Sequence, residues 1–260
     1  MRPKISKILV LPFAVLMISG AALLTWGAET PREPKGRDQP IAAQEPLQPK
    51  ANRREPDPQT NRREENKKPP DATRYSYEFT QPQFYIRHIV IEHDASGQGK
   101  LTFERLGEDT PISEPVDLSI AALGRILGLW TDLHFLDSTE DYQSAKQFAH
   151  LGTMRLHMEN GEHKRTAEFN WTNNKQAAAL INEYRRLADQ IIFVFELSLA
   201  RENQPLNTPK LMDELESMLG RGGLSDPYQL VPLLRDFTTD EHVPLIARNH
   251  AARLLKRIEK

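Results

Sequence analysis

The side chains best suited to chemistry in this chain are its eight histidines, and they raise the question of a metal site. They are His88, His93, His134, His150, His157, His163, His242 and His250. Metal-binding histidines recur at spacings that bring two rings to one face of a helix or hairpin. His157 and His163 are close in sequence, but the hairpin expected there sends them to opposite faces. His88 and His93 are five residues apart in an expected strand, which also separates them, so we predict no metal site.

Catalytic motifs in the sequence are incomplete. Residues 97–102 echo a phosphate-binding loop, but Asp94 occupies the position of its first glycine and an expected strand follows where a helix is required. The chain contains no cysteine and no G-x-S-x-G nucleophile elbow. Acidic side chains such as Asp137 and Glu140 lie in a polar loop without a recognisable partner, which leaves paired-carboxylate hydrolysis open. We therefore expect no catalytic residue and no cofactor, and we favour a protein that is not an enzyme.

One surface could bind a ligand: the outer face of a hairpin expected between residues 153 and 171. It combines hydrogen-bond donors and acceptors, and the side chains singled out are Arg155, His157, Lys164, Glu168 and Asn170. The competing interpretation, a solvated sheet face whose side chains pair across strands, is favoured. Trp130 and Trp171 are expected in the core instead of stacking on a ligand.

Alternating residues predict this hairpin. Met154, Leu156 and Met158 alternate with polar side chains, and Asn160-Gly161 supplies a two-residue turn of type I′. The turn would place Met158 opposite His163 and Met154 opposite Ala167. The apolar side chains of both arms would then share one face of the sheet.

The other elements place the hairpin in an α+β domain over residues 74–202. Strand formers around turn residues predict strands at 84–93, 100–106 and 112–116. A helix capped by Ser119 follows, with Ile120, Leu123, Ile126, Leu127 and Trp130 on one stripe. The order indicates a small antiparallel sheet with two helices on one face. This topology is similar to several uncharacterised bacterial envelope domains, a likeness that implies no activity.

The second helix of this domain is long, and its end is ambiguous. Thr172 or Asn173 is expected to cap it. Residues 191–199 have the composition of a strand, but no turn residue separates them from the helix before them. We therefore expect the helix to continue through them.

Residues 205–260 are expected to be helical, with helix starts at Thr208-Pro209 and at Asp226-Pro227. In this segment, Leu230-Val231-Pro232-Leu233-Leu234-Arg235-Asp236 precedes Ala247-Arg248-Asn249-His250-Ala251-Ala252-Arg253-Leu254-Leu255. Residues 226–258 thereby resemble a single HEAT repeat, with a proline inside the first helix and an arginine before paired alanines in the second. The resemblance implies a protein-binding surface, although one repeat cannot bury its own faces. The helices either pack on the α+β domain, which is favoured, or wait for a partner.

The first 28 residues predict export. Residues 8–28 carry no charge and follow Arg2, Lys4 and Lys7, which is typical of a cleaved signal peptide or of an uncleaved membrane anchor with its N-terminus inside. Both interpretations stay open, with a slight preference for the anchor. Residues 29–73 combine nine prolines with dense mixed charge and no aromatic side chain, which predicts a disordered linker. The remainder would be tethered outside the inner membrane, or periplasmic or secreted after cleavage.

These expectations favour a non-catalytic extracytoplasmic module that binds or scaffolds another envelope protein. The net charge of −2 argues against nucleic acid as a partner. Two alternatives stay open. An envelope hydrolase would need a pocket where dispersed Asp, Glu and His side chains converge. A small-molecule or glycan binder would need a cleft lined by aromatic side chains.

Overall fold

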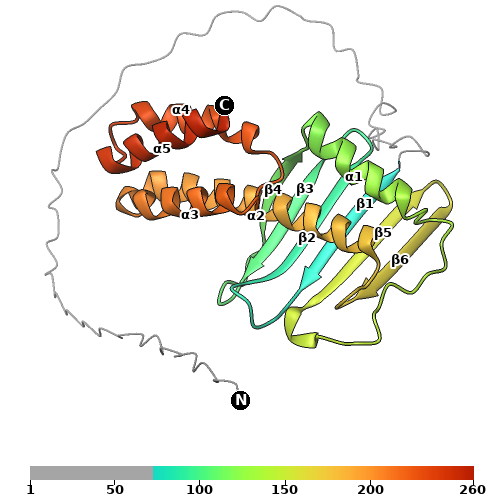
Figure 1. The fold of residues 1–260 in the computed structure, drawn as a ribbon. Helices are drawn as coiled ribbons and strands as arrows, with labels where there is room; N and C mark the ends of the chain where they lie inside the picture. Colours follow the sequence, from blue (N-terminus) through green and yellow to red (C-terminus); the bar gives the residue numbers. More distant parts are fainter. Residues whose placement is uncertain (1–72) are drawn as a thin grey trace, which may run out of the picture. The chain divides into compact units, whose positions relative to one another are not determined.

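The computed structural model describes residues 73–260, and Figure 1 shows the arrangement of their helices and strands. The predicted membrane segment at 8–28 lies outside the described residues, as does the predicted linker except for its last residue. Among residues 73–260, no helix has the length and apolar character needed to cross a bilayer.

The described residues form an α+β fold around one antiparallel sheet of six strands, which confirms the predicted class. The strands are β1 (Arg74–Thr80), β2 (Ile86–Asp94), β3 (Gln98–Arg105), β4 (Ile112–Asp117), β5 (Thr153–Asn160) and β6 (His163–Phe169). Their spatial order is β4-β3-β2-β1-β5-β6, so the first strand is central. The sequence analysis missed β1, although Tyr75, Tyr77 and Phe79 alternate along it and point into the core.

The β5–β6 hairpin has the predicted faces but not the predicted register. Met158 pairs with Arg165 and Met154 with Phe169, two residues beyond the expected partners. The loop is Gly161-Glu162, and in the described chain only the glycine of this pair has a positive φ, of 60°. A glycine at the first loop position is the signature of a type II′ turn, so Asn160 stays in the strand. A shift of two residues leaves every side chain on its predicted face.

Two helices cover one face of the sheet: α1 (Ile120–Asp132) and α2 (Lys175–Asn203), both visible in Figure 1. Ser119 caps α1 as predicted, because its hydroxyl accepts a hydrogen bond from the Ala122 amide at 3.2 Å. The buried stripe of α1 is Ala122, Ile126 and Trp130. Ile120 was predicted on that stripe but is 92% exposed. It precedes Ala122 by two positions, which places it on the far side of the helix.

Helix α2 settles the ambiguous segment, because it runs without interruption through residues 191–199. Its N-cap is Asn174, whose side-chain oxygen accepts a hydrogen bond from the Ala177 amide at 2.9 Å. The predicted caps have other partners. The Thr172 hydroxyl accepts from the Asn174 backbone amide at 3.1 Å, and Asn173 Nδ2 donates to the Ser144 hydroxyl at 3.0 Å.

The core of the sheet contains one chain of buried polar groups. Trp130 Nε1 donates to the Tyr184 hydroxyl at 2.9 Å, and this hydroxyl lies 2.8 Å from His93 Nε2. His93 Nδ1 lies 2.8 Å from the Asp94 carbonyl oxygen, which can only accept, so Nδ1 carries the proton and Nε2 is the acceptor. Burial lowers the pKa of His93 and favours this neutral form.

Helix α2 also joins the sheet to the C-terminal helices α3 (Thr208–Gly220), α4 (Val231–Thr239) and α5 (Leu245–Ile258). Phe193 and Leu197, near its end, belong to a second hydrophobic cluster together with buried residues of those helices. Short 3-10 turns occupy Ala149–Leu151, Pro205–Asn207 and Pro227–Leu230. Polar contacts add to this packing, because Arg125 Nη2 donates to the Ser225 carbonyl at 2.7 Å and Gln229 Nε2 to the Asp117 carbonyl at 2.8 Å. The C-terminal helices therefore pack on the rest of the fold.

Candidate functional site

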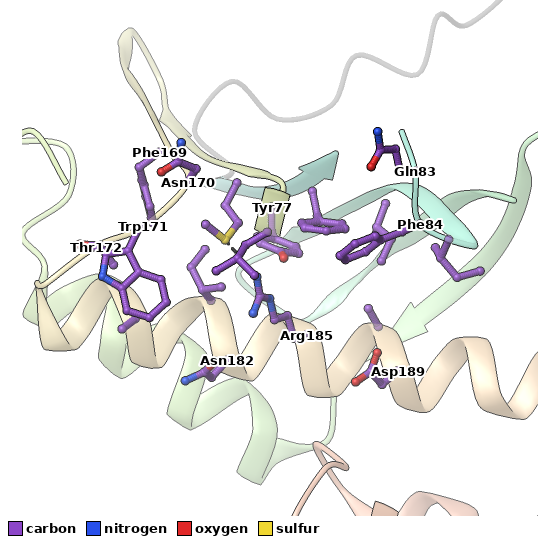
Figure 2. A pocket seen from close by; sticks show the side chains of 18 of the residues that line it. Tyr77, Gln83, Phe84, Phe169, Asn170, Trp171, Thr172, Asn182, Arg185 and Asp189 are labelled. Carbon is purple, nitrogen blue, oxygen red and sulfur yellow. Dashed lines mark hydrogen bonds between the residues drawn. The ribbon is translucent and has the colours of Figure 1, made fainter. Parts of the chain in front are cut away.

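A cleft of about 870 Å³ opens between the inner face of the sheet and helix α2 (Figure 2). This volume is within the range of small-molecule sites in proteins. Strands β1, β2 and β5 line it, together with the end of β6, the segment before β2 and one side of α2. The apolar lining side chains are Tyr77, Phe79, Phe84, Tyr85, Ile86, Ile89, Leu151, Met154, Phe169, Trp171, Ala178, Ile181 and Ala188.

Small residues leave space between the helix and the sheet here. Ala178 and Ala188 face the cleft from α2, where larger side chains would fill it. On the sheet side, Gly152 lies against the ring of Phe79. A Cβ atom at Gly152 would come within 2.5 Å of Phe79 Cε2, and its φ of +92° is strained for other residues. Gly152 therefore helps to fix the ring that forms part of the cleft wall.

Three aromatic side chains at the cleft remain open to solvent. Phe84, Tyr85 and Trp171 are 43%, 60% and 42% exposed, which is unusual for three rings of this size that line one cleft. Figure 2 shows Trp171 and Phe84 toward opposite ends of the cleft. Solvent-exposed rings that border an apolar cavity are suited to contact a ligand.

Trp171 is a correction to the sequence analysis, which expected it in the core. Strand β6 ends at Phe169, so Trp171 is not part of the second arm of the hairpin. Asn170, the residue between them, holds the turn, because its side-chain oxygen accepts from the Phe148 amide at 3.1 Å and lies 3.3 Å from Gln143 Nε2. The chain then turns away from the sheet, and Trp171 packs edge-on against Phe148 at the cleft.

One positive charge lies in the middle of the cleft. Figure 2 shows Arg185 reaching from α2 toward the sheet, between Trp171 and Phe84. Its guanidinium lies 5.7 Å from the ring centre of Phe79, and its Nη2 lies 3.2 Å from Met154 Sδ. Within residues 73–260, no carboxylate forms a salt bridge with it at 4.0 Å or less. Arg185 is solvent-exposed, its nearest contacts in the cleft are a ring and a thioether, and the one carboxylate that acts on it from the cleft, Asp189, lies beyond salt-bridge distance.

A second polar group of the cleft has no hydrogen bond. The Tyr77 hydroxyl is buried, and none of the described residues forms a hydrogen bond of ordinary geometry with it. Burial raises the pKa of Tyr77 to about 12, although Arg185 is close enough to act in the opposite direction. A buried hydroxyl without a partner is uncommon and costs free energy, which marks this point of the cleft as incomplete.

The cleft contains few groups that could do acid–base chemistry. Asp189 is its one carboxyl group among the described residues, and no histidine is in its lining. Asp189 touches solvent, yet partial loss of hydration raises the pKa of its carboxyl, while Arg221 and Arg185 act to lower it. Paired-carboxylate hydrolysis needs two such groups across a bond. In the part of the chain that the structure describes, no three His, Asp or Glu side chains lie together as metal ligands would.

The surface predicted from sequence lies on the other face of the sheet. Arg155 forms salt bridges with Glu78 at 2.8 Å and with Glu168 at 2.7 Å, and His157 Nδ1 lies 2.8 Å from the Thr166 hydroxyl. Lys164 pairs in register with Glu159. Asn170 is separate from this group, because it follows β6 and lines the cleft. Its predicted place on the outer face is therefore wrong, and the binding role of the other four stays a prediction.

Sequence reasoning missed most of the cleft. Phe84 and Tyr85 were included in a strand, but they precede β2 and are exposed beside the opening. Arg185 was not singled out. It follows the buried Tyr184 by one position and is itself exposed, so no pattern in the sequence distinguishes it from the other surface arginines of α2.

Comparison with known proteins adds no family to this description: no protein-family model and no curated protein sequence matches the chain. The resemblance of residues 226–258 to a HEAT repeat stays a prediction. In the structure, Pro232 lies in the first turn of α4.

Proposed function

We propose that this protein is a non-catalytic binding module that holds an apolar ligand in the cleft between the sheet and α2. The observation that carries the proposal is the gathering of Phe84, Tyr85 and Trp171, all solvent-exposed, around an apolar cavity of about 870 Å³. An aromatic-lined cleft is what the small-molecule alternative required. The proposal also keeps the sequence-based expectation that residues 8–28 export or anchor the chain, so that the ligand is met outside the cytoplasm.

An apolar ligand fits the cleft better than a glycan. A sugar needs several free hydrogen-bonding groups beside an aromatic platform. The polar lining residues are Gln83, Asn170, Thr172, Asn182, Arg185 and Asp189. Two of them already serve the local fold, because the side-chain oxygen of Asn170 and the hydroxyl of Thr172 accept backbone hydrogen bonds.

A protein partner in the envelope is a second proposal, and one observation favours it. Leu245 and Ile246, at the start of α5, are 62% and 68% exposed. A photoreactive residue at position 246 should cross-link to such a partner, whereas one at Lys256, about three turns along the same helix, should not. Equal cross-linking from both positions would contradict a specific surface.

Methyl NMR of the full chain would test the binding proposal. With 13C-methyl methionine, Met154 reports on the cleft, while Met212 and Met218, buried among the C-terminal helices, serve as internal controls. We expect decan-1-ol or decanoate to shift the Met154 signal to saturation without moving the two controls. An unchanged Met154 signal with both compounds would overturn the proposal.

A matched pair of variants would place the ligand. Ala178→Phe puts a ring into the cleft and should abolish the saturable shift of Met154. Gln176→Phe adds the same ring at an exposed position of α2 outside the cleft lining, and should leave binding unchanged. Equal loss of binding in the two variants would show that a ring on α2 acts generally, and not by filling the cleft.

A further inference from the structure

Arg185 gives the cleft a chemical preference that its apolar lining alone would not. Its guanidinium contacts a ring and a thioether, and within residues 73–260 it has no carboxylate within salt-bridge distance. A guanidinium offers five N–H donors, and the contact with Met154 sulfur is a weak use of them. The donors that remain are suited to a planar anion bound through two parallel hydrogen bonds.

The Tyr77 hydroxyl lies beside Arg185 and points to the same ligand group. It is buried and lines the same cleft, and its O–H has no acceptor of ordinary hydrogen-bond geometry among the described residues, although Arg185 is close enough to donate toward its oxygen. Its pKa of about 12 keeps it protonated at physiological pH, so it can donate a hydrogen bond. An oxygen acceptor held by Arg185 would give this hydroxyl the partner that it lacks. Two donors that converge in an apolar cleft describe an anion site.

The apolar lining residues of the cleft indicate that the rest of the ligand is a hydrocarbon chain. Figure 2 shows the cleft running along α2 with Arg185 between Trp171 and Phe84. Ile181 and Leu151 also line it, and both are apolar. A flexible hydrocarbon chain can follow such an elongated cleft, and each buried CH₂ group contributes about 0.8 kcal/mol.

A carboxylate near Arg185 opposes additional negative charge on the head group. Asp189 follows Arg185 by four positions on α2 and lines the same cleft. It lies close enough that the pKa of its carboxyl responds to Arg185. A doubly charged phosphate would be repelled by this carboxylate more strongly than a carboxylate head would. The site therefore favours a monoanion.

We propose that the ligand is a long-chain monocarboxylic acid, with its carboxylate on Arg185 and Tyr77 and its chain along the aromatic lining. This inference rests on the proposed binding function and adds the identity of the head group. The hydrocarbon chain is inferred from the apolar lining along α2, and the carboxylate from the two neighbouring donors.

The experiment compares decanoate with decan-1-ol, which share a chain length and differ in charge. Both are titrated into the full chain at pH 8, with the Met154 methyl signal as the readout. We expect decanoate to bind at least about tenfold more tightly than the alcohol, because a charge-assisted pair is stronger than a neutral hydrogen bond. Equal affinities would overturn the inference and leave the binding function intact. Absence of binding by either compound would overturn both.

Two variants assign the preference to its donors. Arg185→Met should make the two affinities equal. Its affinity for decan-1-ol should stay that of the wild type, and this unchanged affinity would show that the cleft still forms. Tyr77→Phe should reduce the preference by about threefold, since one neutral donor is lost. A preference for decanoate that survives Arg185→Met would contradict the assignment.

Decyl phosphate separates the carboxylate from other anions. At pH 8 it carries close to two negative charges, and we expect weaker binding than for decanoate because of Asp189. Binding of decyl phosphate tighter than that of decanoate would overturn the monocarboxylate and would assign the site to a phosphorylated amphiphile.

Discussion

The two faces of the sheet use their polar residues in opposite ways. On the outer face, charged side chains pair with each other: His88 lies 3.0 Å from Glu78 and 3.2 Å from Glu104, and Arg155 bridges Glu78 and Glu168. On the inner face, the cleft holds few polar groups; among residues 73–260, Arg185 has no carboxylate within salt-bridge distance, and the O–H of Tyr77 beside it has no acceptor of ordinary geometry. The face richer in chemical groups has therefore already satisfied them, whereas the apolar face has groups left for a ligand.

A core substitution on β5 should have the largest effect on stability and tests which face of the sheet is packed. Leu156 points into the core and is fully buried. Leu156→Ala should lower the free energy of unfolding by about 2–5 kcal/mol, because it removes buried methyl groups and leaves a cavity. Urea denaturation would measure the loss. A change below about 1 kcal/mol would mean that the inner face is not the packed side of the sheet.

Acidification should lower the free energy of unfolding, because the buried His93 is stable in its neutral form. Burial lowers the pKa of His93 in the folded protein below its ordinary value of 6.5, so the unfolded chain binds this proton more tightly. The free energy of unfolding should therefore fall as pH drops below about 6.5, by at most about 1.4 kcal/mol per pH unit, and level off below the folded pKa. Urea denaturation between pH 8 and pH 4.5 would measure it.

A pair of histidine variants isolates this contribution. His93→Gln should be less stable at pH 8 but should lose less stability on acidification than the wild type. His163→Gln, at an exposed position of β6, should keep the wild-type pH dependence. An unchanged acid response in His93→Gln would assign the proton to another group.

The exposed ring of Trp171 should matter for binding more than for stability. Trp171→Ala should weaken decanoate and decan-1-ol alike by about fivefold, since it removes apolar contact and leaves the charge in place. The free energy of unfolding should change by less than about 1 kcal/mol. Tyr228→Ala removes a ring that is 62% exposed outside the cleft, and should leave both affinities unchanged. Equal effects of the two variants would contradict a ligand at Trp171.

Arg155 on the outer face should have the smallest effect. Arg155→Ala breaks its two salt bridges, which are solvent-exposed, so the free energy of unfolding should fall by no more than about 1 kcal/mol. The loss should shrink in 0.5 M salt, where such pairs are screened. The affinity for decanoate should not change. Weaker decanoate binding in this variant would move the ligand site to the face first predicted from sequence.

Local patterns were enough to predict several elements. The alternation around Met154 and Leu156 fixed which face of the β5–β6 hairpin is buried, and the lack of a turn before residue 191 indicated a continuous α2. The pattern of β1 is equally regular, but it follows directly on the predicted linker, and no turn residue in the pattern marks where the strand begins. The register was missed because Gly161 can begin a type II′ turn as readily as it can end a type I′ turn.

The cleft could not be predicted in the same way, because it depends on contacts between distant segments. Trp171 reaches the opening only because Asn170 ends the strand with hydrogen bonds to Gln143 and Phe148. The space itself depends on alanines of α2 that face the sheet. Neither fact has a periodic signature, since tertiary contacts set both.

The most direct test of the central claim is a measurement of intermolecular NOEs between decanoate and the 13C-methyl methionines of the full chain. The account predicts NOEs from the decanoate chain protons to the methyl group of Met154, and none to Met212 or Met218. If decanoate at saturating concentration gives NOEs to Met212 or Met218 and none to Met154, then the ligand does not occupy the cleft and the account is contradicted.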